Sequence, residues 1–565
     1  MTVSAAPVSH AVPAKPVRHD RRWWAVAIFA ILVWSVVKAG VDPTNVINTR
    51  GWSQVQNFFA AMFQPDLSRA MVELTIREAA VTVGYALVGT ALAVVIGTIG
   101  GLILTERMWS PLHGPMAKGR VGWLVGRVVF ALPRSMHEVV FGLVLVNILG
   151  LNPLVAILAI GIPFGAVTAK VFAELIDEVP RDAELQLRAA GAGRLTALVF
   201  GTVPTVLSDL VSYAFYRFEC SLRSAAVLGI VGAGGLGFQL ALSFQSLRYN
   251  QMWTLLWALI ILSGIADRWS SLVRRRRSAV AVEMHAARDI AVDVGVESKT
   301  RPERDRFLRA SAIICTLGVP IAVWRLGLDF STLWAPRART LAGELVNNAW
   351  PPQIGTGGFG GLVEDALDTI ALAVLSIALA WTVASPVAFL ARRPGRGAGS
   401  FGGFARRFGA AGVRFVLLIC RSVPPPVWAF VVVFVLFPGL WPGVVALAIY
   451  NAGILGRLQA EVVENADQRP ADILAAMGAS APGALTVATV PAVAGRFAAL
   501  GLYRWEVAIR ETVIVGVVGA AGLGRRLDEQ TSSFDYDGIL ATILALLVVT
   551  IAVDVASASI RRSIR

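Results

Sequence analysis

Residues 79–104 read AAVTVGYALVGTALAVVIGTIGGLIL, a stretch of 26 residues without a charged side chain. As an α-helix this stretch is about 39 Å long at ~1.5 Å per residue, longer than the roughly 30 Å hydrocarbon core of a bilayer. A helix also satisfies its own backbone hydrogen bonds, which lipid cannot do. The stretch therefore predicts a membrane-spanning helix. Further apolar stretches lie at 23–39, 124–149, 153–178, 205–231 and 252–273.

The overall composition agrees with a chain that lies in a bilayer. Apolar residues make up 56% and charged residues 16% of the 565 residues, with a mean hydropathy of +0.66, outside the range of soluble domains. The net charge of +14 would also suit a nucleic-acid-binding protein, but the arginines cluster beside apolar stretches, as at 274–277. Such clusters are typical of cytoplasmic loops, so we expect contact with lipid and not with nucleic acid.

The sequence contains a long internal repeat with an offset of 287 residues. The matched pairs include Asp42 and Asp329, Thr82 and Thr369, Arg134 and Arg421, Glu174 and Glu461, and Asp267 and Asp554. A repeat of this length indicates a duplicated domain. We predict an N-terminal tail at 1–22, a first transmembrane domain at 23–273, a charged linker at 274–306 and a second transmembrane domain at 307–565. The expected fold is an all-α polytopic bundle of about 12 spans in two parallel halves.

The distribution of basic residues predicts the orientation of the chain. The N-terminal tail, the segment 107–127, the loop 181–194 and the linker are all rich in arginine, which places them on the cytoplasmic side by the positive-inside rule. An even number of spans in each half returns the chain to the same side. We therefore expect a multi-pass protein of the cell (plasma or inner) membrane, with both termini in the cytoplasm.

A polar loop motif occurs once in each half. Residues 187–195 read LRAAGAGRL, and Pro204 follows Gly191 by thirteen residues; Gly478 and Pro491 have the same spacing in the second half. A short helix interrupted by glycine and a second one stopped by proline would form a protruding element that fits the groove of a partner. A single copy could equally be an ordinary loop helix, but two copies with one spacing favour a docking element.

This motif resembles the cytoplasmic coupling loop of ABC importer permeases. The resemblance implies a type I permease fold, two copies of a separate ATPase subunit that bind ATP-Mg, an extracytoplasmic substrate-binding protein, and no cofactor bound by this chain. The family acid is matched by Asp472, whereas Leu185 stands there in the first half and Glu184 precedes it. The expected coupling residues are Glu184, Arg188, Ala189, Gly191 and Pro204 in the first half, and Asp472, Ala476, Gly478 and Pro491 in the second.

A narrower resemblance is to the permeases of phosphonate importers. It rests on Tyr216-Arg217-Phe218-Glu219, on Arg223, on the segment 227–237 and on Arg134-Ser135 followed by Glu138. The second half repeats most of this pattern, with Pro425 in place of the acid. The resemblance implies a small oxyanion as cargo, either phosphonate, phosphate or phosphite. The candidate pathway residues are Arg134, Ser135, Arg217, Arg223, Arg421, Ser422, Arg504 and Arg510.

The charged residues of the fifth span in each half require partners, because an unpaired charge costs roughly 2.5–3.5 kcal/mol in the membrane. Glu219 and Arg223 are four residues apart, as are Glu506 and Arg510, so both pairs are expected to be structural ion pairs. Arg217 and Arg504 then have no local partner. They could snorkel, pair with another helix (Arg217 with Glu138, for example) or face a water-filled pathway.

Other motifs argue against other functions. Gly232, Gly234 and Gly237 spell a dinucleotide-binding fingerprint, but they follow a span instead of a strand, which favours tight packing or a hinge. No Gly-Lys dipeptide, and hence no P-loop, occurs, and the five histidines have no metal-ligand spacing. We expect neither a catalytic nor a metal site. The alternatives are an ABC permease for another small polar solute, a secondary transporter or a membrane-embedded enzyme.

Overall fold

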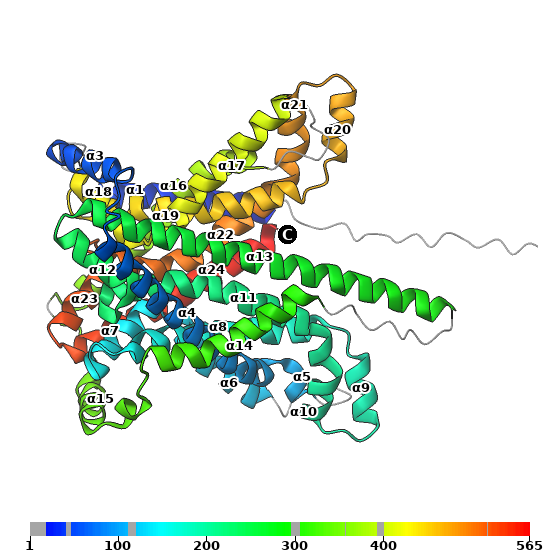
Figure 1. Cartoon of the computed structure of the whole chain (residues 1–565), viewed down its shortest axis with the longest axis horizontal. Helices are drawn as coiled ribbons and strands as arrows, with labels where there is room; N and C mark the ends of the chain where they lie inside the picture. The colour runs from blue at the N-terminus through cyan, green and yellow to red at the C-terminus, as the bar shows by residue number, and fades with distance from the viewer. Residues whose placement is uncertain are drawn as a thin grey trace, which may run out of the picture.

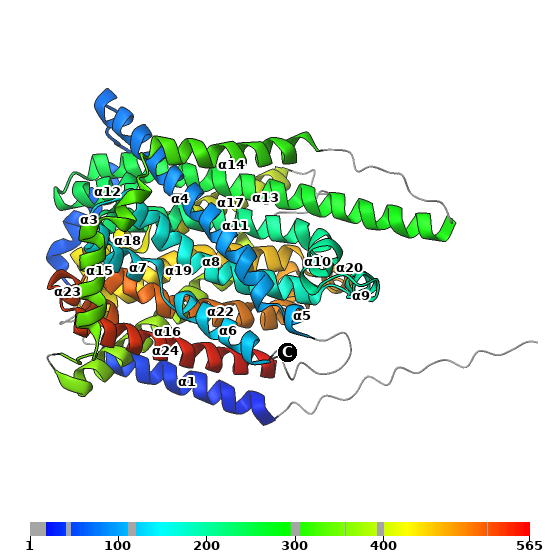
Figure 2. The ribbon, with the colours of Figure 1, turned by 90° about the horizontal axis from the view of Figure 1, so that it is seen from below.

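The computed structural model describes residues 19–40, 47–110, 120–294, 305–355, 357–392, 401–516 and 518–564. These residues form a bundle of long helices that run roughly side by side (Figure 1, Figure 2). In this described part, nine helices are long and apolar enough to cross a membrane, or up to eleven if each of two bent pairs counts as one span. A shorter apolar helix, Trp23–Ala39, adds to these, so the number of spans is close to the prediction.

Each half contributes a comparable series of helices. The first half contains α1 (His19–Ala39), α3 (Trp52–Ala61), α4 (Arg69–Leu104), α5 (Glu106–Trp109), α6 (Arg120–Ser135), α7 (Glu138–Leu149), α8 (Pro153–Glu178), α9 (Asp182–Ala189), α10 (Arg194–Ala197), α11 (Val203–Leu228), α12 (Gly235–Gln245) and α13 (Tyr249–Val294). The second half contains α14 (Arg306–Arg325), α15 (Pro336–Ala349), α16 (Gly358–Leu390), α17 (Phe401–Ser422), α18 (Pro425–Val435), α19 (Leu440–Glu464), α20 (Arg469–Ala476), α21 (Ala481–Ala484), α22 (Val490–Gly516), α23 (Leu523–Ser532) and α24 (Tyr536–Ile564).

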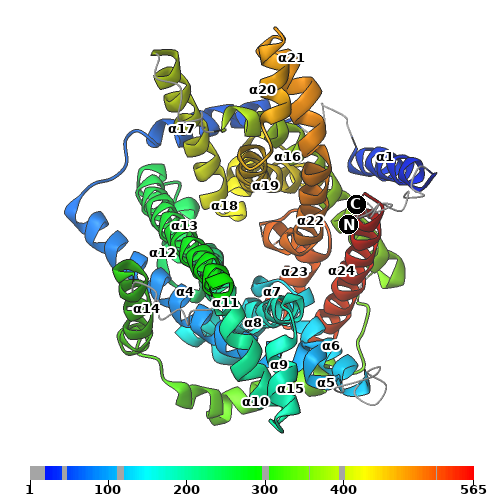
Figure 3. The ribbon, with the colours of Figure 1, turned by 90° about the vertical axis from the view of Figure 1, so that its right-hand side faces the viewer.

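The two ends of the bundle differ. The short helices α9, α10, α20 and α21 lie at one end, together with the C-terminus and the start of α1, whereas α3, α15 and α23 lie at the opposite end (Figure 1, Figure 2). Figure 3 views the bundle from the end that carries α9, α10, α20 and α21. Both loop motifs of the repeat are therefore on the same side of the molecule, as expected for a parallel duplication.

The third predicted span of each half is not one continuous helix, which corrects the expectation for 124–149. Helices α6 and α7 meet at an angle of 83°, and α17 and α18 at 93°. In the second half, Pro424 and Pro425 stand at the break, and proline cannot continue a preceding helix. In the first half, Pro133 lies in the last turn of α6, and His137 caps the start of α7. The bend places α7 and α18 inside the bundle.

Helix α13 extends into the predicted linker. Helix α13 continues past Arg274 to Val294, because no glycine or proline interrupts the sequence until Gly295. Residues 295–304 lie outside the described part, as do residues 1–18 of the predicted tail, and α14 begins at Arg306.

The short helices α7 and α18 connect the two halves. Val139, Val140 and Leu143 of α7 belong to a buried cluster that consists mainly of residues from the second half. Helix α18 packs in turn against the first half, where Phe430 stacks on Phe244 of α12 with ring centroids 4.0 Å apart. Van der Waals packing of these side chains stabilises the contact between the halves, since apolar lipid supplies no hydrophobic driving force between helices.

Close packing of α4 against α8 depends on small residues. A Cβ atom added to Gly97 would lie 2.4 Å from Cγ2 of Thr168, and one added to Gly101 would lie 2.8 Å from Cβ of Phe172. Small residues let helix backbones approach each other, which is how helices associate in lipid. The glycines of residues 79–104 therefore serve the packing between helices as well as the apolar character of the span.

We predict that Gly97→Ala destabilises the folded chain by about 1–3 kcal/mol, because overpacking forces α4 and α8 apart. The matched control is Gly412→Ala in α17, where an added Cβ meets nothing within 4 Å. Thermal unfolding of the purified protein measures the effect. Equal melting temperatures for both variants would show that the α4–α8 contact is looser than described.

Candidate functional site

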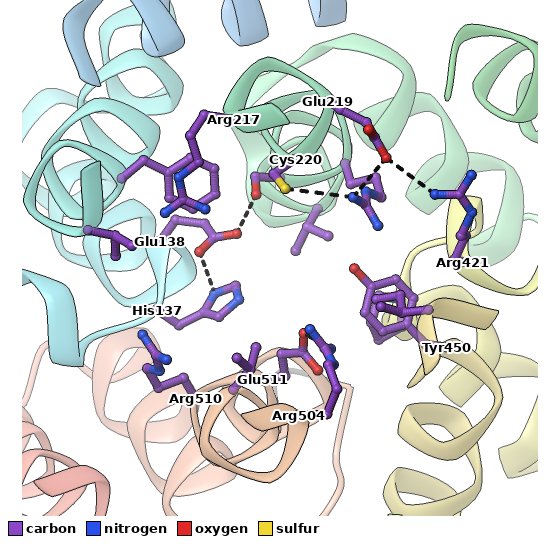
Figure 4. Close-up of a pocket in the computed structure, with 18 of the residues that line it drawn as sticks. His137, Glu138, Arg217, Glu219, Cys220, Arg421, Tyr450, Arg504, Arg510 and Glu511 are labelled. Carbon is purple, nitrogen blue, oxygen red and sulfur yellow. Dashed lines mark hydrogen bonds and ion pairs between the residues drawn. The ribbon is translucent and has the colours of Figure 1, made fainter. Parts of the chain in front are cut away.

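A cavity of about 390 Å³ lies between the two halves (Figure 4), more than ten times the ~30 Å³ that a water molecule occupies in the liquid. Eight arginines and four glutamates are among the residues that line it, so positive charge dominates. The arginines are Arg134, Arg217, Arg223, Arg274, Arg421, Arg457, Arg504 and Arg510, and the glutamates are Glu138, Glu219, Glu461 and Glu511.

The broken third span of the first half directs two polar side chains into this cavity. His137 precedes α7 in an extended conformation, and its Nδ1 accepts a hydrogen bond from the backbone N–H of Val139 (3.3 Å). Glu138 opens α7, is only 7% exposed and accepts a hydrogen bond from the hydroxyl of Ser224. The bend thus turns the start of a helix toward the cavity, and helix N-termini favour negative charge.

An ion-pair network crosses from one half to the other on one side of the cavity. Glu219 of α11 lies 3.6 Å from Arg223 and 3.2 Å from Arg421 of α17. The network extends to the last span of the first half, because Asp267 of α13 contacts Arg421 (3.0 Å) and Arg457 of α19. Two carboxylates of the first half are therefore shared by Arg223 of the same half and by two guanidinium groups of the second half.

The repeat places an equivalent set of four residues on the other side, but that set is not joined. The counterparts at the same offset are Arg134, Lys170, Glu506 and Asp554. No ion pair connects either of these cations to either of these acids. Glu506 contacts Arg561 instead, and Lys170 pairs with Glu174 at 3.6 Å. The prediction that Glu506 pairs with Arg510 is therefore wrong. The carboxylate of Glu506 pairs with Arg561, and Arg510 donates a hydrogen bond to the backbone carbonyl of Arg134 (3.0 Å).

Arg504 does have a local partner, which also corrects the sequence-based expectation. Its Nη2 lies 2.7 Å from Glu511, and its Nε donates to the side-chain oxygen of Asn451 (2.8 Å). Glu511 is seven residues along the same helix, and two helical turns return a side chain to the same face. A spacing of four residues, on which the predicted ion pairs were based, does not include this pair.

Arg217 is different, because it faces the cavity without an acidic partner. Its guanidinium carbon lies 4.2 Å from the ring centroid of Phe164 and 5.7 Å from that of Tyr213. Among the described residues, no carboxylate oxygen is within 4.0 Å of its nitrogens. Of the alternatives considered for Arg217, pairing with Glu138 is not observed.

Most predicted pathway residues meet at the cavity. Arg134, Arg217, Arg223, Arg421, Ser422, Arg504 and Arg510 line it, whereas Ser135 is not among the lining residues, and its hydroxyl donates to the carbonyl of Leu132 (2.7 Å). Tyr450, Arg457, Tyr503 and Glu511 also line it but were not predicted as pathway residues. Two of them had a sequence signal, since Arg457 matches Lys170 in the repeat and Tyr503 matches Tyr216. Within the described residues, no three His, Cys, Asp or Glu side chains are placed to hold a metal ion.

The two loop motifs have the same backbone geometry. Helix α9 ends before Gly191 and α20 before Gly478, with φ values of +90° and +91°. In both loops the residue after the glycine donates back to the helix, from Ala192 to Leu187 and from Ala479 to Leu474, at 3.0 Å each. This is a left-handed helix end that favours glycine. Pro204 and Pro491 then stand in the first turn of the long helices α11 and α22.

The acidic residues of the loops are placed differently. Glu184 is 4% exposed and lies 3.5 Å from Arg107 and 3.6 Å from Arg188, so it fastens α9 to the end of the second span. Asp472 is exposed in the first turn of α20. Ala189 and Ala476 are the last residues of α9 and α20. The loops thus share their shape but not their attachment.

The family model of binding-protein-dependent transport system inner membrane components matches residues 109–278 and again 395–565, together more than half of the chain. The chain belongs to this family. The two matches confirm that two homologous transport permease domains are fused in one polypeptide, each with one loop motif and one wall of the cavity.

Named relatives of this permease include transport proteins for phosphorus oxyanions. A phosphate-import permease of Mycolicibacterium smegmatis is 27% identical over 85% of this chain and 84% of its own length. A phosphite transport system permease of Stutzerimonas stutzeri is 32% identical over 43% of this chain and 85% of its own length. An inward-facing methionine ABC transporter structure has 22% identity and a TM-score of 0.32 over 36% of this chain and 96% of that chain. The two relatives are named as permeases, in agreement with the prediction that this chain is not an enzyme.

We predict that Arg421→Gln destabilises the permease by about 3 kcal/mol, because it removes one partner of a buried ion pair and leaves Glu219 without its closest cation. The double variant Glu219→Gln, Arg421→Gln should not recover this loss, because Arg223 then loses its carboxylate partner while Arg457 stays with Asp267. Lys170→Gln is the control, a cation of the unjoined set whose side chain is 45% exposed. Thermal unfolding and folded yield in detergent measure all three. If Arg421→Gln and Lys170→Gln behave alike, the network does not hold the halves together.

Proposed function

We propose that this chain is the permease of an ATP-driven ABC importer that moves a small oxyanion (phosphonate, phosphate or phosphite) into the cytoplasm. The observation that carries the proposal is the arginine-rich cavity between the two halves. The names of the phosphate and phosphite permeases among its relatives support the same class of cargo.

The chemistry of the cavity suits a tetrahedral oxyanion. A guanidinium group offers a planar fork of N–H donors that can bind two oxygens of one anion. Four of these groups, Arg223, Arg421, Arg457 and Arg504, already lie within 4.0 Å of a glutamate or aspartate oxygen. A surplus of positive charge therefore remains to attract an anion, while the paired charges limit how tightly it is held, which suits a pathway from which the cargo must leave.

The two loop motifs support the proposed assembly. Each loop offers one protruding short helix pair at the same end of the bundle (Figure 1), so one copy of this chain would serve two ATPase subunits, which would bind the ATP and Mg²⁺. The external binding protein would dock at the opposite end, near α3 and α15. Because the C-terminus and the start of α1 lie at the loop end, both termini would be cytoplasmic.

Uptake by the reconstituted complex tests the function. Proteoliposomes that contain the permease, its ATPase subunits and its binding protein should accumulate phosphate, phosphite or a phosphonate only when ATP is supplied. The native mass of the same preparation should correspond to one permease chain with two ATPase subunits. Uptake that needs an ion gradient and no ATPase would establish a secondary transporter, and ATP-driven uptake of an unrelated solute alone would remove the oxyanion assignment.

The coupling loops give a second prediction. Gly191→Val and Gly478→Val should each lower substrate-stimulated ATP hydrolysis at least several-fold, because a left-handed conformation costs a residue with a Cβ roughly 1–2 kcal/mol. Gly191→Asn and Gly478→Asn are the matched controls, since asparagine tolerates this conformation; an added Cβ meets nothing within 4 Å at either position. Hydrolysis as in the unmodified complex in both valine variants would show that the bend is not needed for coupling.

A further inference from the structure

The carboxylates of the cavity are not shared evenly among its arginines. Arg223, Arg421, Arg457 and Arg504 each lie within 4.0 Å of a carboxylate oxygen. Arg217 does not, although it is only 9% exposed, and its Nε has no hydrogen-bond partner. A buried guanidinium group without a partner is costly in a low-dielectric interior, so this position requires an explanation.

Comparison of the two halves shows what neutralises Arg504 and leaves Arg217 free. Arg504 and Glu511 are seven residues apart on α22, and the position that corresponds to Glu511 on α11 is Ser224. Asn451 contacts one side of Arg504. At Arg217 the aromatic ring of Phe164 takes the place of this amide. The first half therefore has neither the acid nor the amide that satisfies the arginine in the second half.

The acid of the first half stands at another position, Glu138. Glu138 has no acidic counterpart, because Pro425 occupies the corresponding position of the second half. Glu138 is bonded to Ser224, and Ser224 lies on the same face of α11 as Arg217, two turns away. Figure 4 shows Glu138 between Arg217 and His137 at the edge of the cavity. In the second half, Arg504 and Glu511 are also seven residues apart, and there the arginine side chain contacts the carboxylate directly.

We propose that Arg217 and Glu138 form the two ends of an oxyanion subsite, which binds a tetrahedral oxyanion that carries a proton. The inference rests on the proposed function and assigns the recognition to one wall of the cavity. The guanidinium group of Arg217 donates to two oxygens of the anion. As a carboxylate, Glu138 only accepts hydrogen bonds, so it binds the P–OH group of a protonated phosphate or phosphite or of a phosphonate monoanion.

The acid also excludes the wrong anion. Sulfate has the same shape but carries no proton near neutral pH, so its oxygen would face the carboxylate of Glu138 without a hydrogen bond and with like charge. Such a repulsive element discriminates between ligands more strongly than a further attractive contact would. An arginine alone would accept both anions.

Two other arginines of the cavity also lack an acidic partner, but they are less suited to this role. Arg510 uses one nitrogen to donate to the carbonyl of Arg134, and Arg134 belongs to the set that the repeat leaves unjoined. They add to the positive potential on the side of Arg217. Of the three, Arg217 is the one that shares a helix face with the serine that holds Glu138.

The test measures binding to the complex of the permease with its ATPase subunits in nanodiscs, without the external binding protein, which has a selectivity of its own. Radiolabelled inorganic phosphate is the probe, and phosphite and sulfate are the competitors. For the unmodified complex we expect phosphite, but not sulfate, to displace phosphate. Arg217→Gln should weaken phosphate binding about tenfold or more, the loss of one to two charge-assisted hydrogen bonds.

Glu138→Gln separates recognition from simple charge, because glutamine keeps the shape and adds a donor. This variant should let sulfate compete within about threefold of phosphate, a change that a merely structural residue would not cause. Lys170→Gln is the control, because Lys170 does not line the cavity and its side chain is 45% exposed: the ratio of sulfate to phosphate affinity should stay as in the unmodified complex. Thermal unfolding and size-exclusion profiles of every variant report folding separately.

Several results would overturn the subsite. Phosphate binding that is equally tight in Arg217→Gln, effective displacement by sulfate from the unmodified complex, or unchanged discrimination in Glu138→Gln would each do so. So would the absence of phosphate and phosphite binding to the unmodified complex, even if the full importer with its binding protein still accumulates phosphate. That last result would leave the proposed transport function intact and remove only the subsite.

Discussion

The charge of a buried guanidinium group is the constraint on which the interior of this permease depends. An arginine in the membrane must find an acid, an aromatic face or water, because the cost of leaving it unpaired is several kcal/mol. Glu219 and Asp267 meet this need for Arg421 and Arg457 across the boundary between the halves. The same contacts that neutralise the cavity therefore also hold its two walls at a fixed distance on one side.

The bends after α6 and α17 are the second requirement for the cavity. A straight third span would keep α7 and α18 parallel to the other helices, and neither could reach the opposite half. Because each chain segment turns by more than 80°, its apolar second part packs on the other half. In the first half, His137 and Glu138 follow the bend and line the cavity. In the second half, Pro424 and Pro425 stand at the bend and add no charge.

Much of this architecture follows from patterns in the sequence. Apolar stretches and the offset of 287 residues predict spans, halves and the shared end of the loops, since these features depend on composition and local spacing. The contacts of the arginines depend instead on helices that are distant in the chain. Partners four residues away were considered, so the Glu219–Arg223 pair was anticipated, but Arg504 uses an acid seven residues away, and Glu506 uses Arg561. The bends were missed because hydropathy does not change where a helix turns inside the bundle.

The fusion of both halves in one polypeptide has a consequence for how such a cavity can evolve. In a permease built from two identical chains, every substitution in the pathway appears twice, once on each wall, because the symmetry of the dimer requires it. Here each wall is encoded separately, and an acid has come to stand at residue 138 on one side and at residue 511 on the other. Single mutations can therefore change the recognition on one wall while the other continues to hold the structure together.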